Sequence, residues 1–339
     1  MMAAILCAAI LPTVGVLRAQ EWKVTFEEPA NKLALLPDER LIAVALGRGT
    51  GLLQEPRPCD VVLLDMASGA ERQVLKGNLD GVRTVAYSRR HRLLASGGYD
   101  GHVRLWDISK GELIADISPE VGSILAMTFA PNERSLVMSG WRGNQDEIAD
   151  SLLIWDVIEQ RQDKKREMKL NAVIDLAVAP DGLHLASCSL DGTVAIWTLP
   201  TLDPAKVLLR AVASVSSISF SPDGAVLAVA HDPRPFNPAQ GSVELWDAKT
   251  WQKVSTIAFS GPVATVRFSL DGNYLVAGGG GVRKLELWDR KAAKLAGSVA
   301  ADDADVSDIC VLPAGRSLIV AQKDGSVERW RFAHIRNGN

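Results

Sequence analysis

The sequence of 339 residues predicts an all-β fold built from one repeated unit. Three observations support this prediction. An apolar residue followed by Trp and Asp recurs along the chain. Each copy is preceded by turn sequences rich in Pro, Asp and Gly, which mark reversals between antiparallel strands. The segments between the turns are short, and none shows the 3.6-residue apolar period of an amphipathic helix.

The repeat is anchored by the apolar–Trp–Asp triplet, which fixes its period. The anchor positions are Leu64-Asp65, Trp106-Asp107, Trp155-Asp156, Trp197, Trp246-Asp247, Trp288-Asp289 and Trp330. Successive anchors are 42, 49, 42, 49, 42 and 42 residues apart. A base period of 42 residues with two insertions of seven therefore predicts seven copies of one structural unit. Six of the nine Trp residues occupy this position, so we assign them a structural role.

Each unit contains the signals for four short strands. The fourth unit illustrates them: an apolar strand ends in the turn Ala179-Pro180-Asp181-Gly182, a second strand ends at Asp191-Gly192, and a third carries Trp197. A fourth strand closes the unit. Four antiparallel strands per 42 residues form one propeller blade. The sequence thus predicts a single seven-bladed β-propeller over residues 21–332, with a short tail at 333–339.

These motifs resemble the WD-repeat β-propeller family over nearly the whole chain. One departure is that the Gly-His dipeptide that usually opens each repeat is absent. In that family the His joins an Asp, a Ser and the Trp in a hydrogen-bonded cluster. The resemblance implies partial clusters in two units, with the other blades relying on packing. The residues concerned are Ser96, Asp100 and Trp106, and Ser187, Asp191 and Trp197.

The two ends of the chain are expected to meet. The last unit ends at Phe332 after its third strand. The alternating segment Trp22–Phe26 precedes the first unit and has no other place in the repeat. We expect it to pair as the outer strand of blade seven, because this removes the open seam of the ring.

Residues 1–20 differ from the rest of the chain. The run from Ala3 to Leu17 is apolar and uncharged, as in a secretory signal peptide. It predicts export to the periplasm or the extracellular space. Two alternatives remain: a cytoplasmic protein whose first residues are an apolar strand or follow a misassigned start, and retention of the segment as a membrane anchor.

Composition excludes several function classes. The net charge is −3 and the charges are interspersed, which argues against nucleic-acid binding. The five histidines form no close metal-binding pair, and no nucleophile elbow is present. We expect no metal, no cofactor and no enzymatic activity.

The candidate binding residues lie in three enlarged connections between second and third strands, which open on one face of a propeller. The segments are 47–60, 141–151 and 231–241. Long loops on a rigid scaffold often carry binding, and Trp, Phe and Arg are common at interface hot spots. The candidates are Arg48, Arg57, Trp141, Arg142, Asp232, Arg234 and Phe236. The alternative is neutral surface variation, with Trp141 packed on its own blade.

The sequence therefore favours a monomeric, non-enzymatic scaffold that binds a protein or peptide. The competing hypothesis is a small-molecule, metal or enzymatic site at the mouth of the central channel. Arg83, Asp175 and Asp308 begin predicted innermost strands and would approach that mouth. A convergent cluster of charged groups with shifted pKa values would favour this second hypothesis. In a third, the chain is part of a larger architecture whose neighbouring domain carries the chemistry.

Overall fold

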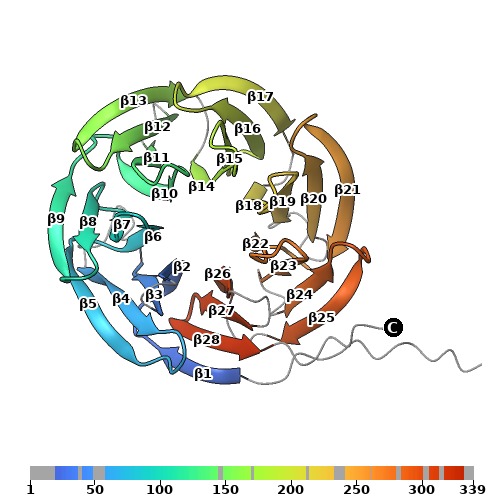
Figure 1. Ribbon diagram of the computed structural model, residues 1–339, viewed down its shortest axis with the longest axis horizontal. Helices are drawn as coiled ribbons and strands as arrows, with labels where there is room; N and C mark the ends of the chain where they lie inside the picture. Colours follow the sequence, from blue (N-terminus) through green and yellow to red (C-terminus); the bar gives the residue numbers. More distant parts are fainter. Residues whose placement is uncertain are drawn as a thin grey trace, which may run out of the picture.

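The computed structural model shows a ring of seven four-stranded antiparallel sheets around a central channel (Figure 1). It describes residues 20–36, 40–48, 58–143, 148–168, 172–210, 214–232, 241–259, 261–279, 284–300, 305–312 and 317–331. None of these residues is helical. The predicted seven-bladed β-propeller is confirmed.

Within each blade the strands run from the channel to the rim in sequence order. Blade one holds β2 (Ala30–Leu36), β3 (Leu41–Leu46), β4 (Cys59–Asp65) and β5 (Glu71–Asn78). Blade two holds β6 (Val82–Ser88), β7 (Leu93–Gly98), β8 (Val103–Asp107) and β9 (Glu112–Ile117). Blade three holds β10 (Ser123–Phe129), β11 (Ser135–Gly143), β12 (Ile148–Asp156) and β13 (Arg161–Met168). Blade four holds β14 (Val173–Val178), β15 (His184–Ser189), β16 (Thr193–Thr198) and β17 (Asp203–Arg210).

The remaining blades follow the same order until the last. Blade five holds β18 (Ser214–Phe220), β19 (Val226–Asp232), β20 (Gly241–Asp247) and β21 (Gln252–Phe259). Blade six holds β22 (Thr265–Phe268), β23 (Tyr274–Gly278), β24 (Lys284–Asp289) and β25 (Lys294–Ala300). Blade seven holds β26 (Val306–Val311), β27 (Ser317–Gln322), β28 (Ser326–Arg331) and the N-terminal β1 (Gln20–Thr25).

The ring closes as predicted, because β1 pairs antiparallel with β28. The indole N–H of Trp22 also donates to the Met66 carbonyl of blade one at 3.1 Å. The guanidinium of Arg329 donates to the same carbonyl at 2.7 Å. Gln20, the last residue assigned to the signal segment, is instead the first residue of β1 and pairs with Trp330. The rest of that segment lies outside the described residues.

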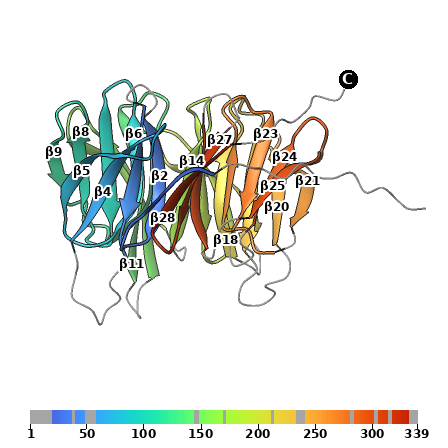
Figure 2. The ribbon, with the colours of Figure 1, turned by 90° about the horizontal axis from the view of Figure 1, so that it is seen from below.

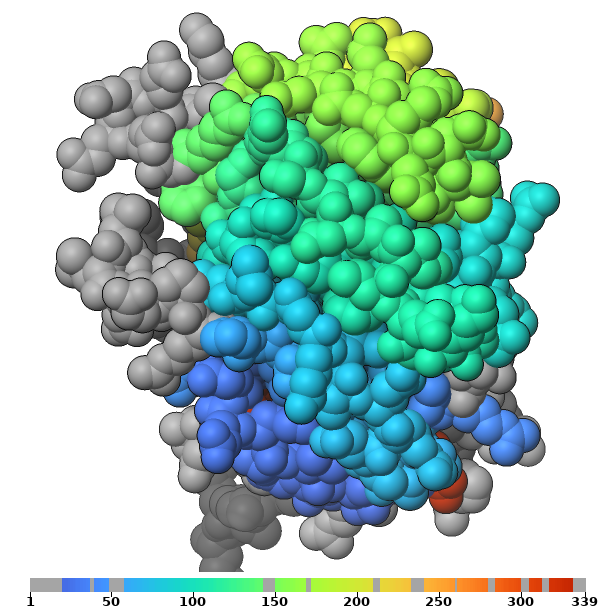
Figure 3. Space-filling model, turned by 90° about the vertical axis from the view of Figure 1, so that its left-hand side faces the viewer, coloured from blue at the N-terminus to red at the C-terminus, as the bar shows by residue number. Residues whose placement is uncertain are grey.

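The core consists of seven buried clusters, one between each pair of neighbouring blades in the described ring. Each repeat Trp packs in the cluster between its own blade and the preceding one. Trp106, for example, is 2% exposed and packs against Leu36, Leu63 and Leu75 of blade one. Figure 3 shows one flank of the disc, where successive blades, coloured from blue to green, stack side by side. The structural role assigned to the repeat Trp residues follows from this inter-blade packing.

The Asp of each Trp-Asp pair forms the turn between third and fourth strands. The Asp107 carboxylate accepts the backbone N–H groups of Ser109 and Lys110 at 2.9 and 3.3 Å. Asp156, Asp247 and Asp289 accept N–H groups two or three residues ahead in the same way. Hydrogen bonds to the ionised form lower the pKa values of Asp107, Asp156 and Asp247, and for Asp107 the largest contribution comes from the Ser109 hydroxyl.

The indole N–H groups of the repeat Trp residues use two kinds of acceptor. In blades two and four a Ser on the second strand accepts, from Trp106 to Ser96 and from Trp197 to Ser187, each at 2.9 Å. In blades five, six and seven the acceptor is a Glu two residues before the Trp on the same strand. These pairs are Trp246–Glu244, Trp288–Glu286 and Trp330–Glu328, at 3.2, 3.1 and 3.0 Å. These three blades therefore have an indole hydrogen bond in addition to their inter-blade packing.

In blade two an Asn stands where the family has its His. The Ser96 hydroxyl, which accepts from Trp106, donates to the Asn78 carbonyl Oδ1 at 3.1 Å. Asp100 completes the arrangement by accepting the Leu79 N–H at 3.0 Å. Asn78 is preceded by Gly77, so the dipeptide Gly-Asn replaces Gly-His here. Asn can accept the hydroxyl hydrogen bond through its amide oxygen, and the cluster persists without the imidazole.

Candidate functional site

The connections from second to third strands and from fourth to first strands open on one face of the disc, here called the loop face. Blade three extends furthest toward it. Its strands β11 and β12 are nine residues each, the longest among the described strands. Figure 2 shows β11 reaching past the lower edge of the disc. The loop face is the side on which the sequence placed its candidate binding residues.

The enlarged connection of blade three is mostly a continued strand pair, which corrects the predicted loop at 141–151. Trp141 pairs with Asp150 and Arg142 with Ala149, and the ladder runs on to Gly143 and Ile148. Only residues 144–147 lie between the strands, and these are outside the described residues. A paired ribbon holds Trp141 and Arg142 in a fixed register, whereas a loop would not.

A glycine in the neighbouring connection lets this ribbon approach blade two. Gly122 has φ +79°, and a Cβ there would lie 2.2 Å from the Trp141 carbonyl oxygen. Any other residue would clash with the ribbon backbone and also be strained at this φ. Gly122 therefore fixes where Trp141 and Arg142 leave the disc.

The other candidate residues have different environments. Arg48 is exposed, with its side chain 73% accessible and 3.8 Å from the Glu28 carboxylate. Asp232 is buried at the end of β19 and lines the channel cavity, so it does not project from the face as predicted. Arg142 is exposed and Trp141 is half-buried. Arg57, Arg234 and Phe236 lie outside the described residues.

Apolar side chains that the sequence analysis did not select are exposed on the same face. Leu79, in the connection before blade two, is 57% exposed. Leu190, in the turn between β15 and β16, is 50% exposed and lines the mouth of the channel. Apolar residues in turns give no periodic signal, and for this reason sequence reasoning missed them.

The channel is lined by innermost strands that carry a β-bulge at the same place. The register shifts occur in six of the seven blades, at residues 31, 83, 125, 174, 216 and 307. The bulged residue and the one after it line a cavity of about 350 Å³ in every one of these blades. Bulges re-aim side chains at barrel and ring openings. The ring of bulges directs two successive side chains per blade toward the channel.

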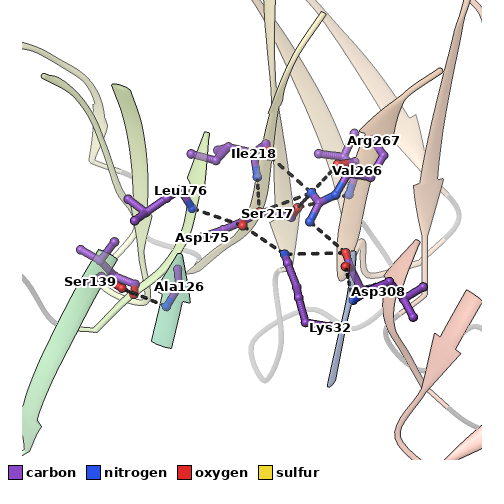
Figure 4. A network of polar contacts seen from close by, with 12 residues as sticks. Lys32, Ala126, Ser139, Asp175, Leu176, Ser217, Ile218, Val266, Arg267 and Asp308 are labelled. Carbon is purple, nitrogen blue, oxygen red and sulfur yellow. Dashed lines mark hydrogen bonds and ion pairs between the residues drawn. The ribbon is translucent and has the colours of Figure 1, made fainter. Parts of the chain in front are cut away.

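Four charged side chains converge across this cavity (Figure 4). The Arg267 guanidinium lies 2.8 Å from the Asp308 carboxylate and 3.4 Å from that of Asp175. The Lys32 ammonium lies 3.3 Å from Asp175 and 3.8 Å from Asp308. The four groups come from blades one, four, six and seven, so the cluster spans the channel. Two positive and two negative charges cancel within it.

Backbone and hydroxyl groups complete the cluster. Asp308 accepts the Leu33 N–H of the next blade at 3.1 Å, and Asp175 accepts the Ile218 N–H of the next blade at 3.2 Å. The Ser217 hydroxyl donates to Asp175 at 2.9 Å and accepts from Arg267 at 2.8 Å. Each aspartate thus joins its own blade to the following one.

The charges of the cluster are strongly coupled. Burial alone would raise the pKa of Asp175, but Lys32 and Arg267 bring it down to about 2. The two aspartates in turn raise the pKa of Arg267 above its usual value. Asp175 is therefore ionised at neutral pH, with its carboxylate bound to Lys32 and Arg267. Within the cluster both aspartate carboxylates are engaged by Lys32 and Arg267.

Sequence reasoning found half of this cluster. Asp175, Asp308 and Arg83 do line the channel as expected. Lys32 and Arg267 were missed, although each is a long cation in an otherwise apolar or small innermost strand. A charge at such a position was the signal that could have identified them.

Neither a metal-binding cluster nor a long apolar helix occurs in the part of the chain that the structure describes. No three His, Cys, Asp or Glu side chains there gather in a way that could hold a metal ion. No helix in these segments has the length and hydropathy to cross a membrane.

Comparisons with known proteins agree with the fold. The family model "WD domain, G-beta repeat" matches residues 69–107 and 166–198. Autophagy-related protein 16 of Arabidopsis thaliana is 24% identical over 259 residues, which are 75% of this chain and 48% of that protein. Protein LST8 homolog of Drosophila melanogaster is 25% identical over 56% of this chain and 60% of its own length. THO complex subunit 3 of Arabidopsis thaliana is 26% identical, over 62% of each chain.

The chain spans less than two thirds of the length of these relatives. The matched segments coincide with the blades in which the Trp–Ser hydrogen bond is present, blades two and four. Seven four-stranded blades, the repeat Trp at six of the seven blade interfaces and these matches agree with one another. The chain is similar to WD-repeat β-propeller proteins in its fold and in these two matched repeats.

Proposed function

We propose that this chain is a non-enzymatic scaffold that binds a protein or peptide partner through its loop face. The observation that carries the proposal is the lengthened β11–β12 ribbon, which presents the exposed Arg142 beside Trp141. A paired ribbon costs a partner little ordering entropy, because its backbone is already fixed. Arg and Trp are the residue types that most often dominate binding energy.

Other features of the same face support the proposal. Arg48, Leu79 and Leu190 are exposed there, so the face mixes apolar and cationic groups. The charged side chains of the channel cluster are paired with one another, so none of them is free to act as a catalytic group. The name of one relative, THO complex subunit 3, also describes a protein that works within an assembly.

The test is a pull-down from the native source with matched variants on the two faces. The loop-face variant carries Trp141→Ala and Arg142→Glu. The control carries Leu183→Ala and Arg90→Glu, in the turns of blades four and two on the opposite face. Circular dichroism and melting temperature establish that both variants are folded.

We expect a partner that is captured by the wild type and the control and lost by the loop-face variant. A partner lost only by the control would place binding on the opposite face. Equal capture by all three proteins would contradict the proposal, and so would the absence of any specific partner.

The cellular location follows from residues 1–20. If this segment is a signal peptide, the protein isolated from its native source begins close to Gln20 and lies outside the cytoplasm. An intact N-terminus in the cytosolic fraction would support the cytoplasmic alternative. We propose that the propeller itself is monomeric, which size-exclusion chromatography with light scattering tests directly.

A further inference from the structure

The mouth of the channel is divided into an apolar arc and a polar arc. Leu125 and Ile174, the bulged residues of blades three and four, line the cavity together with Leu190. The bulged residue of blade two, adjacent to this arc, is Arg83. The remaining wall is mostly polar, with Asn31, Ser216 and Ser307 at the bulges of blades one, five and seven.

Arg83 differs from the other cations of the cavity in having no carboxylate partner within the described part of the chain. Lys32 and Arg267 bind Asp175 and Asp308. Lys323 lies 3.9 Å from Asp305. No ion pair joins Arg83 to another described residue, although its side chain is half-buried in the cavity wall. A guanidinium in this position attracts an anionic group and can bind a carboxylate through two parallel hydrogen bonds.

A second observation also indicates a ligand. The hydroxyl oxygens of Thr84, Thr265 and Ser307 are buried in the cavity wall without a hydrogen-bond partner. Thr84, directly after Arg83, and Thr265 are each 1% exposed. Buried hydroxyls are nearly always hydrogen-bonded in folded proteins, so these groups are placed to contact a polar occupant of the cavity.

We infer that the channel mouth binds an acidic side chain of the partner, with a neighbouring aliphatic residue on the arc formed by Leu125, Ile174 and Leu190. This inference rests on the proposed function and names the chemistry of the partner segment. The carboxylate pairs with Arg83, and the aliphatic group covers the apolar arc. A cavity of about 350 Å³ admits one or two side chains and excludes a folded domain.

The geometry favours a peptide over a free acid. The apolar arc continues from the cavity onto the loop face through Leu190, which is half exposed. A free small acid would leave this exposed surface uncovered, whereas a peptide chain extends over it. Below the mouth, the cluster of Lys32, Asp175, Arg267 and Asp308 is neutral and already paired, so the incoming carboxylate meets Arg83 as the unpaired charge.

The experiment uses a phage-displayed library of random 12-residue peptides selected on the full chain. The same selection is run on Arg83→Gln and on a control, Arg90→Gln, which removes an equal charge from the opposite face. Melting temperatures verify that both variants fold. We expect wild type and control to enrich peptides with Glu or Asp next to Leu, Ile, Val or Met, and Arg83→Gln to lose the acidic preference.

Affinities of one enriched peptide and its Glu→Gln analogue are then measured by calorimetry. Loss of a charge-assisted pair should weaken binding by about tenfold or more, whether the carboxylate or Arg83 is removed. The two changes made together should cost little more than either alone. Enrichment without an acidic residue, no enrichment, or binding that is insensitive to Arg83→Gln would each overturn the inference.

A further arm distinguishes the source of the carboxylate. N-acetylglutamate is titrated in place of the peptide and should bind far more weakly. Equal binding of the free acid, dependent on Arg83, would replace the peptide by a small carboxylate ligand and overturn the inference. A native partner captured equally by wild type and Arg83→Gln, yet lost by the loop-face variant, would leave the proposed function standing and remove only this inference.

Discussion

Trp106 donates its indole N–H to the hydroxyl of Ser96 at 2.9 Å, whereas Trp155 at the same position of the next blade has a buried indole N–H with no acceptor. The difference follows from two residues. The second-strand position occupied by Ser96 in blade two is Met138 in blade three, and the residue two before Trp155 is Leu153. Neither Met138 nor Leu153 offers the oxygen that a Ser or a Glu supplies in the other Trp-bearing blades.

The first prediction compares these two tryptophans. Trp106→Phe removes apolar volume and also leaves the Ser96 hydroxyl without its donor, whereas Trp155→Phe removes an N–H group that was already unsatisfied. We expect Trp106→Phe to destabilise the protein by about 1–3 kcal/mol more than Trp155→Phe, measured by urea unfolding. Equal losses in the two variants would show that the indole hydrogen bond contributes nothing.

The second prediction concerns closure of the ring. Deleting residues 20–27 removes β1, exposes the edge of β28, breaks the hydrogen bond from Trp22 to Met66 and removes the Glu21 partner of Arg329. Blade seven loses its outer strand, and the whole ring should unfold at a lower temperature, because blades stabilise one another. Differential scanning calorimetry measures this, with removal of residues 333–339 as the control. An unchanged melting temperature in the β1 deletion would contradict the closure mechanism.

The third prediction tests the charged cluster of the channel. Asp175→Asn leaves Lys32 and Arg267 with one carboxylate between them, in a buried site. Breaking a buried ion pair from one side costs about 3–5 kcal/mol, which chemical denaturation at pH 7 would reveal. Because the pKa of Asp175 is lowered to about 2, its contribution is complete above pH ~4 and is lost as the pH falls toward 2. The variant should lack this acid-dependent loss.

The fourth prediction concerns Asp150, whose contribution to stability falls, and does not rise, as the pH increases. Asp150 is fully buried, and burial, together with the nearby Asp191, raises its pKa to about 7 despite a hydrogen bond from the Val173 N–H. Between pH ~4 and 7 the folded protein keeps a proton that the unfolded chain releases, so stability falls as the pH rises through this window. We expect Asp150→Asn to remove that fall, on the order of 1 kcal/mol or more. The same pH dependence between pH 4 and 7 in the wild type and in Asp150→Asn would refute the raised pKa.

The sequence predicted the propeller because its signals are local and repeated. An anchor, usually Trp, every 42 or 49 residues and the turns rich in Pro, Asp and Gly each report short-range geometry, and their recurrence in seven units predicted the propeller. Ring closure by residues 22–26 could also be predicted, because the last unit lacked a fourth strand and this segment belonged to no other unit. The channel positions of Arg83, Asp175 and Asp308 could be inferred from their place at the start of innermost strands.

Only the tertiary structure decided which of these residues meet. Lys32 and Asp175 are 143 residues apart in the sequence. The repeat period does not indicate that these two side chains, from blades one and four, meet across the channel. The acceptor of each indole likewise depended on strand register, which placed Glu286 beside Trp288 and left Trp155 facing Leu153 and Met138. The local repeat determined the blades, whereas ring closure and the bulges determined which charges face one another. Contacts across the ring therefore had to come from the folded chain.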